Sequence, residues 1–401
     1  MITRNIFKRT SLSVLVTMTL GAAPFFAEAA SDSANGRQFS SNDEYYVYVG
    51  SRTTKQRKAS GNGIEVYAFN SQTGVMKHLQ TVAGIVNPSY LTMDSKHQHL
   101  YAVQGDTSQV SVFNVDQKNG RLTLVDSEYT GGTNPVHLTL TPDEQHLVIA
   151  NYATGSLASL PVLADGTLDP IVDLVTLKGE EGPHRKQQSS SHPHQTQYDP
   201  SQTWIVSPDK GLDRIFVHKV TADGHLQAAA GDVLQTRSGA GPRHIAFHPS
   251  QPFGYVANEL DNTIGAYRFD SETGALTPFQ ILPTLPSNYT GNNTTSGIFT
   301  SPNGHFVYIS NRGHDSIAIF AVDQKSGQLS LSGQVKTGGK QPRFFTFDKT
   351  GQWLFAANEK SHTITKFKVN PKTGELTPTG DVVETGSPVA MVFSPVSTSK
   401  P

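Results

Sequence analysis

The sequence predicts an all-β protein, a seven-bladed β-propeller built of four-stranded antiparallel blades. Three observations predict it: a repeat that opens on a proline and an apolar strand, a step of 46 to 58 residues between copies, and no helical periodicity beyond the first 30 residues. A period near this length that contains only short strands is typical of propeller blades. The copies are anchored at Pro88, Pro135, Pro193, Pro242, Thr295, Pro342 and Pro388.

Each copy divides into four short strands. The copy at Gly241 reads RHIAF, GYVANE, TIGAYRF and LTPFQIL, with the alternation and the β-branched and aromatic residues that favour strands. The turn between the third and fourth strands repeatedly contains glycine, as in SQTG at Ser71 and SETG at Ser271. Glycine adopts the positive φ of such turns without steric cost, so the repeat carries its own turn signals.

The two ends of the chain predict how the ring closes. The last copy, at Pro388, supplies one inner strand, whereas the segment that starts near Tyr45 supplies three strands without an inner partner. Pairing of the C-terminal strand with the N-terminal strands completes a seventh blade and removes the most exposed strand edge. We therefore expect one propeller domain over residues 43–396, and the closed ring makes a monomer the expected state.

Composition excludes several classes of function. The 401 residues carry a formal net charge of -1, so no global field recruits nucleic acid or an anionic membrane. There is no cysteine, which excludes disulfides, cysteine-zinc sites and thiol nucleophiles.

The N-terminus has the pattern of a signal peptide over residues 1–29. Basic residues around Arg4 precede an apolar run from Ser11 to Leu20, and Ala27-Glu28-Ala29 matches a cleavage site. The polar stretch 30–42 is expected to be a disordered tail. The sequence thus predicts export to the periplasm or the medium, without membrane attachment after cleavage.

Superposition of the copies predicts two rings of side chains near one mouth of the propeller. The first ring takes the residue directly after each anchor: Ser89, Val136, His194, Arg243, Ser296, Arg343 and Val389. The second ring takes the end of each second strand: Ser51, Gly105, Tyr152, Asp209, Glu259, Arg312 and Glu359. The second strand lies beside the inner one, so the second ring can flank the first.

Four of these residues, from three successive copies, are predicted to converge beneath two long loops, 179–193 and 285–297: His194, Arg243, Glu259 and Arg312. A neutral histidine can take a proton from water, and Glu259 can orient that imidazole or act as the base itself. The two arginines can stabilise an oxyanion or clamp a carboxylate or phosphate. Salt bridges that merely close the channel between blades are the alternative interpretation.

Other site types find less support. His192 and His194 fall on one strand face with His184 upstream, but no carboxylate or cysteine follows at metal-ligand spacing. Phosphate-loop, dinucleotide and nucleophile-elbow motifs are missing from the sequence. We therefore expect neither a metal nor a cofactor.

At these residues the chain resembles the seven-bladed lactonase family, which includes the propeller-type 6-phosphogluconolactonase and the fungal carboxy-cis,cis-muconate lactonizing enzyme. The resemblance covers roughly residues 44–395 and is carried by stretches such as GAGPRHIAFHPSQPFGYVANELDNTI at Gly239 and SPNGHFVYISNRGHDSIAIF at Ser301. It implies catalytic roles for the histidine of the third blade, the Arg of GPRH, the Glu of NEL and the Arg of SNR. These are the four residues that the ring argument selects.

The resulting hypothesis is hydrolysis of the ester of a sugar lactone, such as a gluconolactone, with a small-molecule lactone as the only partner. His194 serves as general base held by Glu259, Arg243 and Arg312 act on the carbonyl oxygen, and Arg343 and Tyr152 are candidate substrate-binding residues. Two alternatives stay open. One is a non-catalytic binding propeller of the cell envelope, and the other is formation of a lactone from a muconate.

Overall fold

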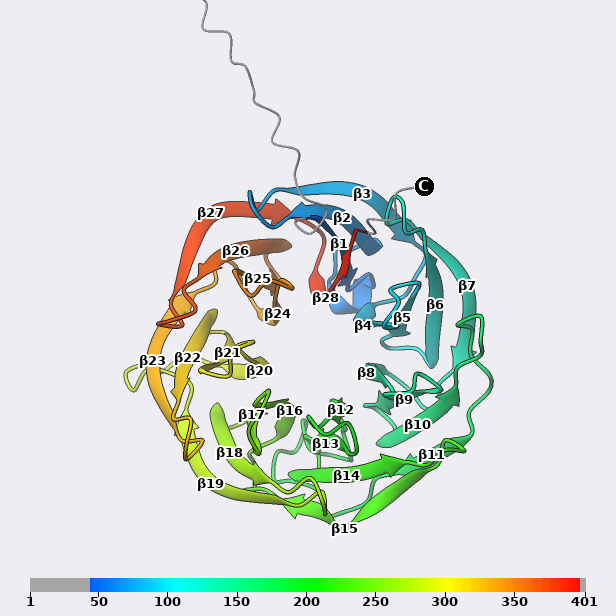
Figure 1. The fold of residues 1–401 in the computed structure, drawn as a ribbon. Coiled ribbons are helices and arrows are strands. Elements are labelled where there is room, and N and C mark those ends of the chain that lie inside the picture. Colours follow the sequence, from blue (N-terminus) through cyan, green and yellow to red (C-terminus); the bar gives the residue numbers. More distant parts are fainter. Residues whose placement is uncertain (1–43, 397–401) are drawn as a thin grey trace, which may run out of the picture. The chain divides into compact units, whose positions relative to one another are not determined.

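The computed structural model describes residues 44–396, which form seven four-stranded antiparallel sheets arranged as blades around a ring (Figure 1). The predicted signal peptide and tail lie outside these residues. One turn of 3₁₀-helix, η2 (Lys55–Arg57), interrupts the strands of the described region. The predicted all-β seven-bladed propeller is confirmed.

Each blade runs from an innermost strand beside the channel to an outermost strand at the rim. In that order the first three blades are β28 (Pro388–Pro395), β1 (Glu44–Ser51), β2 (Gly63–Asn70), β3 (Met76–Ala83); β4 (Pro88–Met93), β5 (His99–Gln104), β6 (Gln109–Val115), β7 (Leu122–Tyr129); and β8 (Pro135–Leu140), β9 (His146–Asn151), β10 (Ser156–Pro161), β11 (Asp173–Thr176). The next two are β12 (Gln197–Tyr198), β13 (Ile205–Asp209), β14 (Arg214–Val220), β15 (Leu226–Gln235); and β16 (Pro242–Phe247), β17 (Phe253–Asn258), β18 (Thr263–Phe269), β19 (Leu276–Pro283). The last two are β20 (Thr294–Thr300), β21 (Phe306–Arg312), β22 (Ser316–Val322), β23 (Leu329–Lys336); and β24 (Pro342–Phe347), β25 (Trp353–Asn358), β26 (Thr363–Val369), β27 (Leu376–Glu384).

The ring closes as the chain ends predict. Strand β28 pairs with β1 in antiparallel register, Val47 opposite Phe393, so the first and last segments of the chain share one blade. Figure 1 shows this junction, where the red β28 lies beside the blue β1. The inner edge of the N-terminal strands is thereby paired rather than exposed.

The core lies between neighbouring blades. The second strands are buried on both faces, as in β9 and β25, and therefore read as continuous apolar runs rather than as alternating ones. Phe69 of one blade packs edge-on against Phe355 of the next, with ring centroids 5.1 Å apart. Each blade thus needs both of its neighbours to bury its faces, which couples the stability of the site to that of the whole ring.

A β-bulge follows the anchor residue in every blade. Pro242 is opposite Asn258 and His244 is opposite Ala257, so Arg243 is one extra residue on the inner strand. The same shift occurs in β4, β8, β20, β24 and β28. In the remaining blade, the bridge between Pro193 and Asp209 and the β12–β13 pairing leave one more residue on the inner segment than on its partner. A bulge bends its strand and re-aims a side chain, and in this propeller it does so at the first predicted ring.

One inner strand is shorter than predicted. The segment from Pro193 forms only an isolated bridge before the two-residue strand β12. Its polar side chains bond to neighbouring blades instead, because Gln195 Oε1 accepts the backbone N–H of Ile245 at 2.6 Å. The inner segment of this blade also keeps backbone hydrogen bonds to its second strand, from His194 N–H to the Pro208 carbonyl at 3.0 Å and from Lys210 N–H to the His192 carbonyl at 3.1 Å.

Candidate active site

A cavity of about 220 Å³ lies among the two predicted rings. It is lined by Arg52, Arg57, Asn134, Val136, Tyr152, Gln187, His194, Lys210, Glu259, Arg312 and Arg343. Five of the six site residues that the sequence predicts are in this lining. The sixth, Arg243, is 3 % exposed and contacts the lining residue Glu259. The structure thus brings all six predicted residues to one place.

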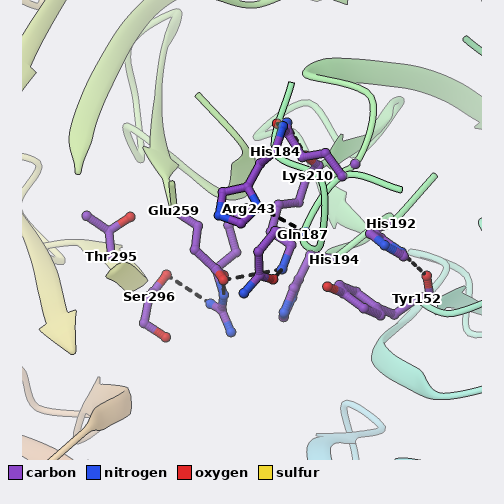
Figure 2. Close-up of polar contacts among 12 residues, drawn as sticks. Tyr152, His184, Gln187, His192, His194, Lys210, Arg243, Glu259, Thr295 and Ser296 are labelled. Atoms are coloured by element: carbon purple, nitrogen blue, oxygen red, sulfur yellow. Dashed lines mark hydrogen bonds and ion pairs between the residues drawn. The ribbon is translucent and has the colours of Figure 1, made fainter. Parts of the chain in front are cut away.

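Glu259 is the hub of the site. Its Oε2 lies 2.9 Å from Arg243 Nε and 3.0 Å from Arg312 Nη2, and its Oε1 lies 3.3 Å from Lys210 Nζ (Figure 2). Burial opposes ionisation of Glu259, but Arg312, Lys210 and Arg243 outweigh it and hold the pKa of its carboxyl well below the usual range. Because its two carboxylate oxygens contact three cations, Glu259 orients the basic side chains around it.

The two arginines are further fixed by the end of the second long loop. Arg243 Nη1 donates to the carbonyl of Ser296 at 2.9 Å, and Arg312 Nη2 donates to the carbonyl of Thr295 at 2.8 Å. Guanidinium groups held by both a carboxylate and a carbonyl lose little entropy when they bind a substrate oxygen. Their remaining N–H groups suit a carbonyl oxygen or an anion.

His194 is buried and has a partner that the sequence pattern did not indicate. Its Nδ1 lies 3.2 Å from Nε2 of His244, so one of the two nitrogens donates a hydrogen bond to the other. Burial and the nearby Arg243 lower the pKa of both imidazoles well below the usual value, which leaves them neutral at neutral pH. The hydrogen-bond partner of His194 Nδ1 is thus His244, whereas the contacts of Glu259 are with Arg243, Arg312 and Lys210.

Tyr152 and Lys210 close the other flank of the cavity. The Tyr152 ring lies edge-on to His194 with centroids 5.5 Å apart and stacks on His192 at 4.4 Å. Lys210 Nζ lies 5.0 Å from the Tyr152 centroid and donates to Gln187 Oε1 at 2.8 Å. Tyr152, Lys210 and Gln187 thus form one wall of the cavity, with an aromatic face and a cation side by side.

The first long loop is fastened over this wall. Asp209 Oδ1 accepts the backbone N–H groups of His192, Gly211 and Leu212. Gln188, which is 1 % exposed, donates from Nε2 to the carbonyl of Lys210 at 2.9 Å. These hydrogen bonds fix the loop, and the loop places Gln187 in the lining of the cavity.

The histidines considered for a metal have other contacts. His192 Nδ1 lies 2.9 Å from the carbonyl of Tyr152, and His184 Nδ1 accepts the backbone N–H of Gln187 at 3.2 Å. In residues 44–396 no group of three or more His, Cys, Asp or Glu side chains is placed to hold a metal ion. The same residues include no helix long and apolar enough to span a membrane.

Sequence reasoning missed six contributors, namely His244 and the five lining residues Arg52, Arg57, Asn134, Gln187 and Lys210. Two of them had a readable signal, because Arg52 and Lys210 each follow directly on a member of the second ring, Ser51 and Asp209. His244 follows Arg243, and simple alternation along a strand would turn it away from the channel. The bulge at Arg243 breaks that alternation, which is why both side chains reach the site.

The chain matches a family model described as "Lactonase, 7-bladed beta-propeller" over residues 46–393. Fold, cavity and this match agree, and the chain belongs to the lactonase family of seven-bladed β-propellers.

Among curated relatives, a 6-phosphogluconolactonase of Bacillus subtilis is 33% identical over 309 residues, which cover 77% of this chain and 86% of that protein. A 6-phosphogluconolactonase of Formosa agariphila is 31% identical over 317 residues, covering 77% and 88%. Among solved structures, a periplasmic gluconolactonase of Pseudomonas aeruginosa superposes with a TM-score of 0.81 at 30% identity, covering 88% of this chain and all of that one. Similar uncharacterised proteins occur in Lactococcus lactis.

Proposed function

We propose that this protein hydrolyses the ester of a sugar lactone. One observation carries the proposal: a buried neutral imidazole faces a cavity whose lining includes five arginine or lysine side chains and one carboxylate. Water attack on a lactone needs a proton acceptor and a stabiliser for the negative charge that develops on the carbonyl oxygen. The names of the B. subtilis and P. aeruginosa relatives support a gluconolactone as the substrate class.

His194 is the proposed general base. When its Nδ1–H donates to His244 Nε2, the lone pair of its own Nε2 is free to accept a proton from water. As His194 becomes an imidazolium, its bond to neutral His244 becomes charge-assisted, and such bonds are about twice as strong as neutral ones. The contact therefore strengthens during the reaction, which is the condition for lowering the barrier.

A neutral acceptor suits this particular site. A carboxylate placed beside His194 would form ion pairs with the nearby arginines, just as Glu259 forms ion pairs with its three basic partners. A histidine accepts the same hydrogen bond without drawing in Arg243. The site thus separates two tasks, with His244 for the base and Glu259 for the cations.

Arg312, Arg243 and Lys210 are the proposed stabilisers of the oxyanion and of the substrate's polar groups. Removal of one such donor typically lowers kcat by ~10²–10³. Arginine keeps its proton in the reaction, so its role is electrostatic throughout. Tyr152 and Arg343 complete the proposed binding surface.

The test is a hydrolysis progress curve, corrected for spontaneous ring opening, with glucono-δ-lactone and its 6-phospho form. Wild-type protein should accelerate at least one lactone, and Arg312→Gln should lower that rate about a hundredfold or more. Acceleration by both proteins alike would remove Arg312 from the mechanism. No acceleration by wild type on either lactone would favour the non-catalytic binding propeller.

We also propose export through a signal peptide over residues 1–29 and action as a monomer. The periplasmic location in the name of the P. aeruginosa relative supports export. N-terminal sequencing of protein recovered from a periplasmic fraction should begin near Ala30, and an intact Met1 in the cytoplasm would contradict it. For the proposed monomer, light scattering of the mature protein should give a single species of about 40 kDa.

A further inference from the structure

A second cavity lies in the channel, separate from the candidate active site. Its volume is about 340 Å³, and it shares no lining residue with the site cavity. Its lining comes from the innermost strands of six blades, β28, β4, β8, β12, β20 and β24, and from two turns that follow them. These strands begin at the mouth that holds the predicted rings and run away from it. The second cavity therefore belongs to the opposite half of the channel.

A layer of aromatic and imidazole rings separates the two cavities. These rings occupy the second position after the anchor, one residue beyond the first predicted ring. Tyr90 stacks on His137 with ring centroids 3.8 Å apart, and both residues line the second cavity. His137 in turn lies edge-on to His244, the partner of His194, at 5.8 Å. The second cavity is thus a compartment of its own, and the chemistry proposed above does not use it.

The walls of this cavity suit an aromatic ring. Phe344 lies edge-on to both Tyr90 and Phe299, with ring centroids 6.1 and 5.6 Å apart. Met93 and Met391 add to the apolar part of the lining, and a thioether side chain adapts readily to an aromatic neighbour. Aromatic rings prefer edge-on and offset contacts, so one further ring can pack among these side chains.

Two hydrogen-bond donors line the end of the cavity nearer the candidate active site. His137 Nδ1 accepts the backbone N–H of Thr196 at 3.2 Å, so the proton of the neutral ring is on Nε2. This Nε2–H is buried and has no hydrogen-bond partner within residues 44–396. Burial and Arg243 lower the pKa of His137 to about 3, and burial raises the pKa of Tyr90 to about 12, so both side chains are uncharged donors at neutral pH. An oxygen atom of a bound molecule would supply the acceptor that a buried donor requires.

A cation lies at the other end of the cavity. Lys349 and His97 are in the turns that follow β24 and β4, and both line the cavity. Lys349 is exposed, and none of the ion pairs in the described part of the chain includes it. Burial and the nearby charge of Lys349 lower the pKa of His97, while Asp94 and Glu144 act in the opposite direction with smaller effects. This end of the cavity therefore favours an anionic group.

From this arrangement we propose that the second cavity binds a small aromatic carboxylate with an oxygen at its opposite end, the class represented by the hydroxybenzoates. The ring packs among Phe299, Phe344 and Tyr90, the carboxylate faces Lys349, and the second oxygen accepts from His137. A volume of about 340 Å³ is near the lower end of the range for small-molecule sites, which fits a ligand with a single ring. None of these residues takes part in the proposed lactone chemistry, so the binding is independent of the proposed function.

The methionine methyl groups report on this cavity directly. A chain that starts near Ala30 contains Met76, Met93 and Met391, of which the last two line the cavity, whereas Met76 is on the outermost strand β3. With carbon-13 in these methyl groups, titration of 4-hydroxybenzoate should shift the NMR signals of Met93 and Met391 and leave that of Met76 in place. The expected dissociation constant is below about 1 mM. Unshifted signals of both cavity methionines would overturn the proposal.

Two analogues test the two ends of the ligand. Benzoate lacks the second oxygen, and 4-hydroxybenzyl alcohol lacks the carboxylate. Each should bind about fivefold or more weakly than 4-hydroxybenzoate, because each loses one hydrogen-bonded group. Benzoate that binds as tightly as 4-hydroxybenzoate would refute the role of His137, and an alcohol that does so would refute the role of Lys349.

Substitutions then locate the bound molecule. Lys349→Gln should weaken binding about tenfold, whereas Lys325→Gln, the matched change at another exposed lysine, should not alter it. Thr346→Phe fills the cavity and should abolish binding, and a phenylalanine fits there because Phe299 occupies the equivalent position of β20. Binding should persist in Arg312→Gln, since its loss in that variant would place the carboxylate in the candidate active site and contradict the second site.

Discussion

The substitution Glu259→Gln should destabilise the protein far more than the loss of a surface charge. Glu259 is 6 % exposed and contacts Arg243, Arg312 and Lys210 at 2.9, 3.0 and 3.3 Å. Glutamine keeps the size of the side chain but leaves the buried basic groups without a counterion. Breaking a buried ion pair in this way typically costs about 3–5 kcal/mol in the free energy of unfolding.

The assay is equilibrium unfolding in urea, followed by the fluorescence of the buried Trp204 and Trp353. The matched control is Asp261→Asn, another carboxylate-to-amide change, whose partner Arg237 is half exposed. An exposed pair of this kind contributes about 1 kcal/mol or less. The urea midpoint of Glu259→Gln should therefore fall well below that of the control at pH 7.

The pH dependence of this difference has a definite sign. The pKa of Glu259 is depressed in the folded state, while the unfolded value is about 4.3. The stabilisation from Glu259 is thus complete above the unfolded pKa and is lost as the pH falls through it toward the folded pKa. The gap between wild type and Glu259→Gln should narrow between pH 5 and pH 3. Equal midpoints of Glu259→Gln and Asp261→Asn at pH 7 would refute the assignment of Glu259 as the hub.

The remaining predictions concern activity. His244→Phe should lower kcat about ten- to hundredfold with little change in KM. His244→Gln, which retains a hydrogen-bond acceptor, should have a kcat between those of His244→Phe and wild type. A change in KM as large as the change in kcat, and the same in both variants, would indicate a merely structural role for His244. Nitrogen-15 NMR of the imidazoles should find His194 with its proton on Nδ1, and a proton on Nε2 would contradict its role as base. Because burial and Arg243 lower the pKa of His194, kcat/KM should stay level down to pH 6.5 and decline only below it, so a decline that begins near pH 7 would contradict the burial argument. Gln187→Ala removes one hydrogen bond to the cavity wall and should raise KM by about tenfold or less, whereas an unchanged KM would place this residue outside substrate binding.

The sequence was sufficient to predict the fold because each blade repeats the same local signals. The anchor proline, the apolar second strand and the turn glycine recur together, so a single misread copy could not change the count of blades. The closure by β28 followed from the same periodicity, since an inner strand at Pro388 had no other partner. The shortness of β12 was not predictable, because it depends on contacts with another blade. Gln195, for example, accepts a hydrogen bond from the backbone N–H of Ile245.

The site was predictable as far as blade equivalence reaches. His194, which belongs to the first ring, and Glu259 and Arg312, which belong to the second, were found because each ring takes the same position from every copy. His244, the partner of His194, was not found. The bulge that turns both Arg243 and His244 toward the site arises from the pairing of β16 with β17 and is not visible in the residue pattern. Gln187 comes from a loop without an equivalent in the other blades, so superposition of the copies could not identify it.

The most direct test of the central claim is the comparison of wild type with His194→Gln on the lactone that wild type hydrolyses fastest. The rate is measured above spontaneous hydrolysis, with His305→Gln, an exposed histidine, as the control. A general base contributes about 10²–10⁴-fold, so kcat should fall by that factor in His194→Gln and stay at the wild-type level in the control. A rate in His194→Gln that equals the wild-type rate would show that the buried imidazole at the centre of this site does not perform the chemistry.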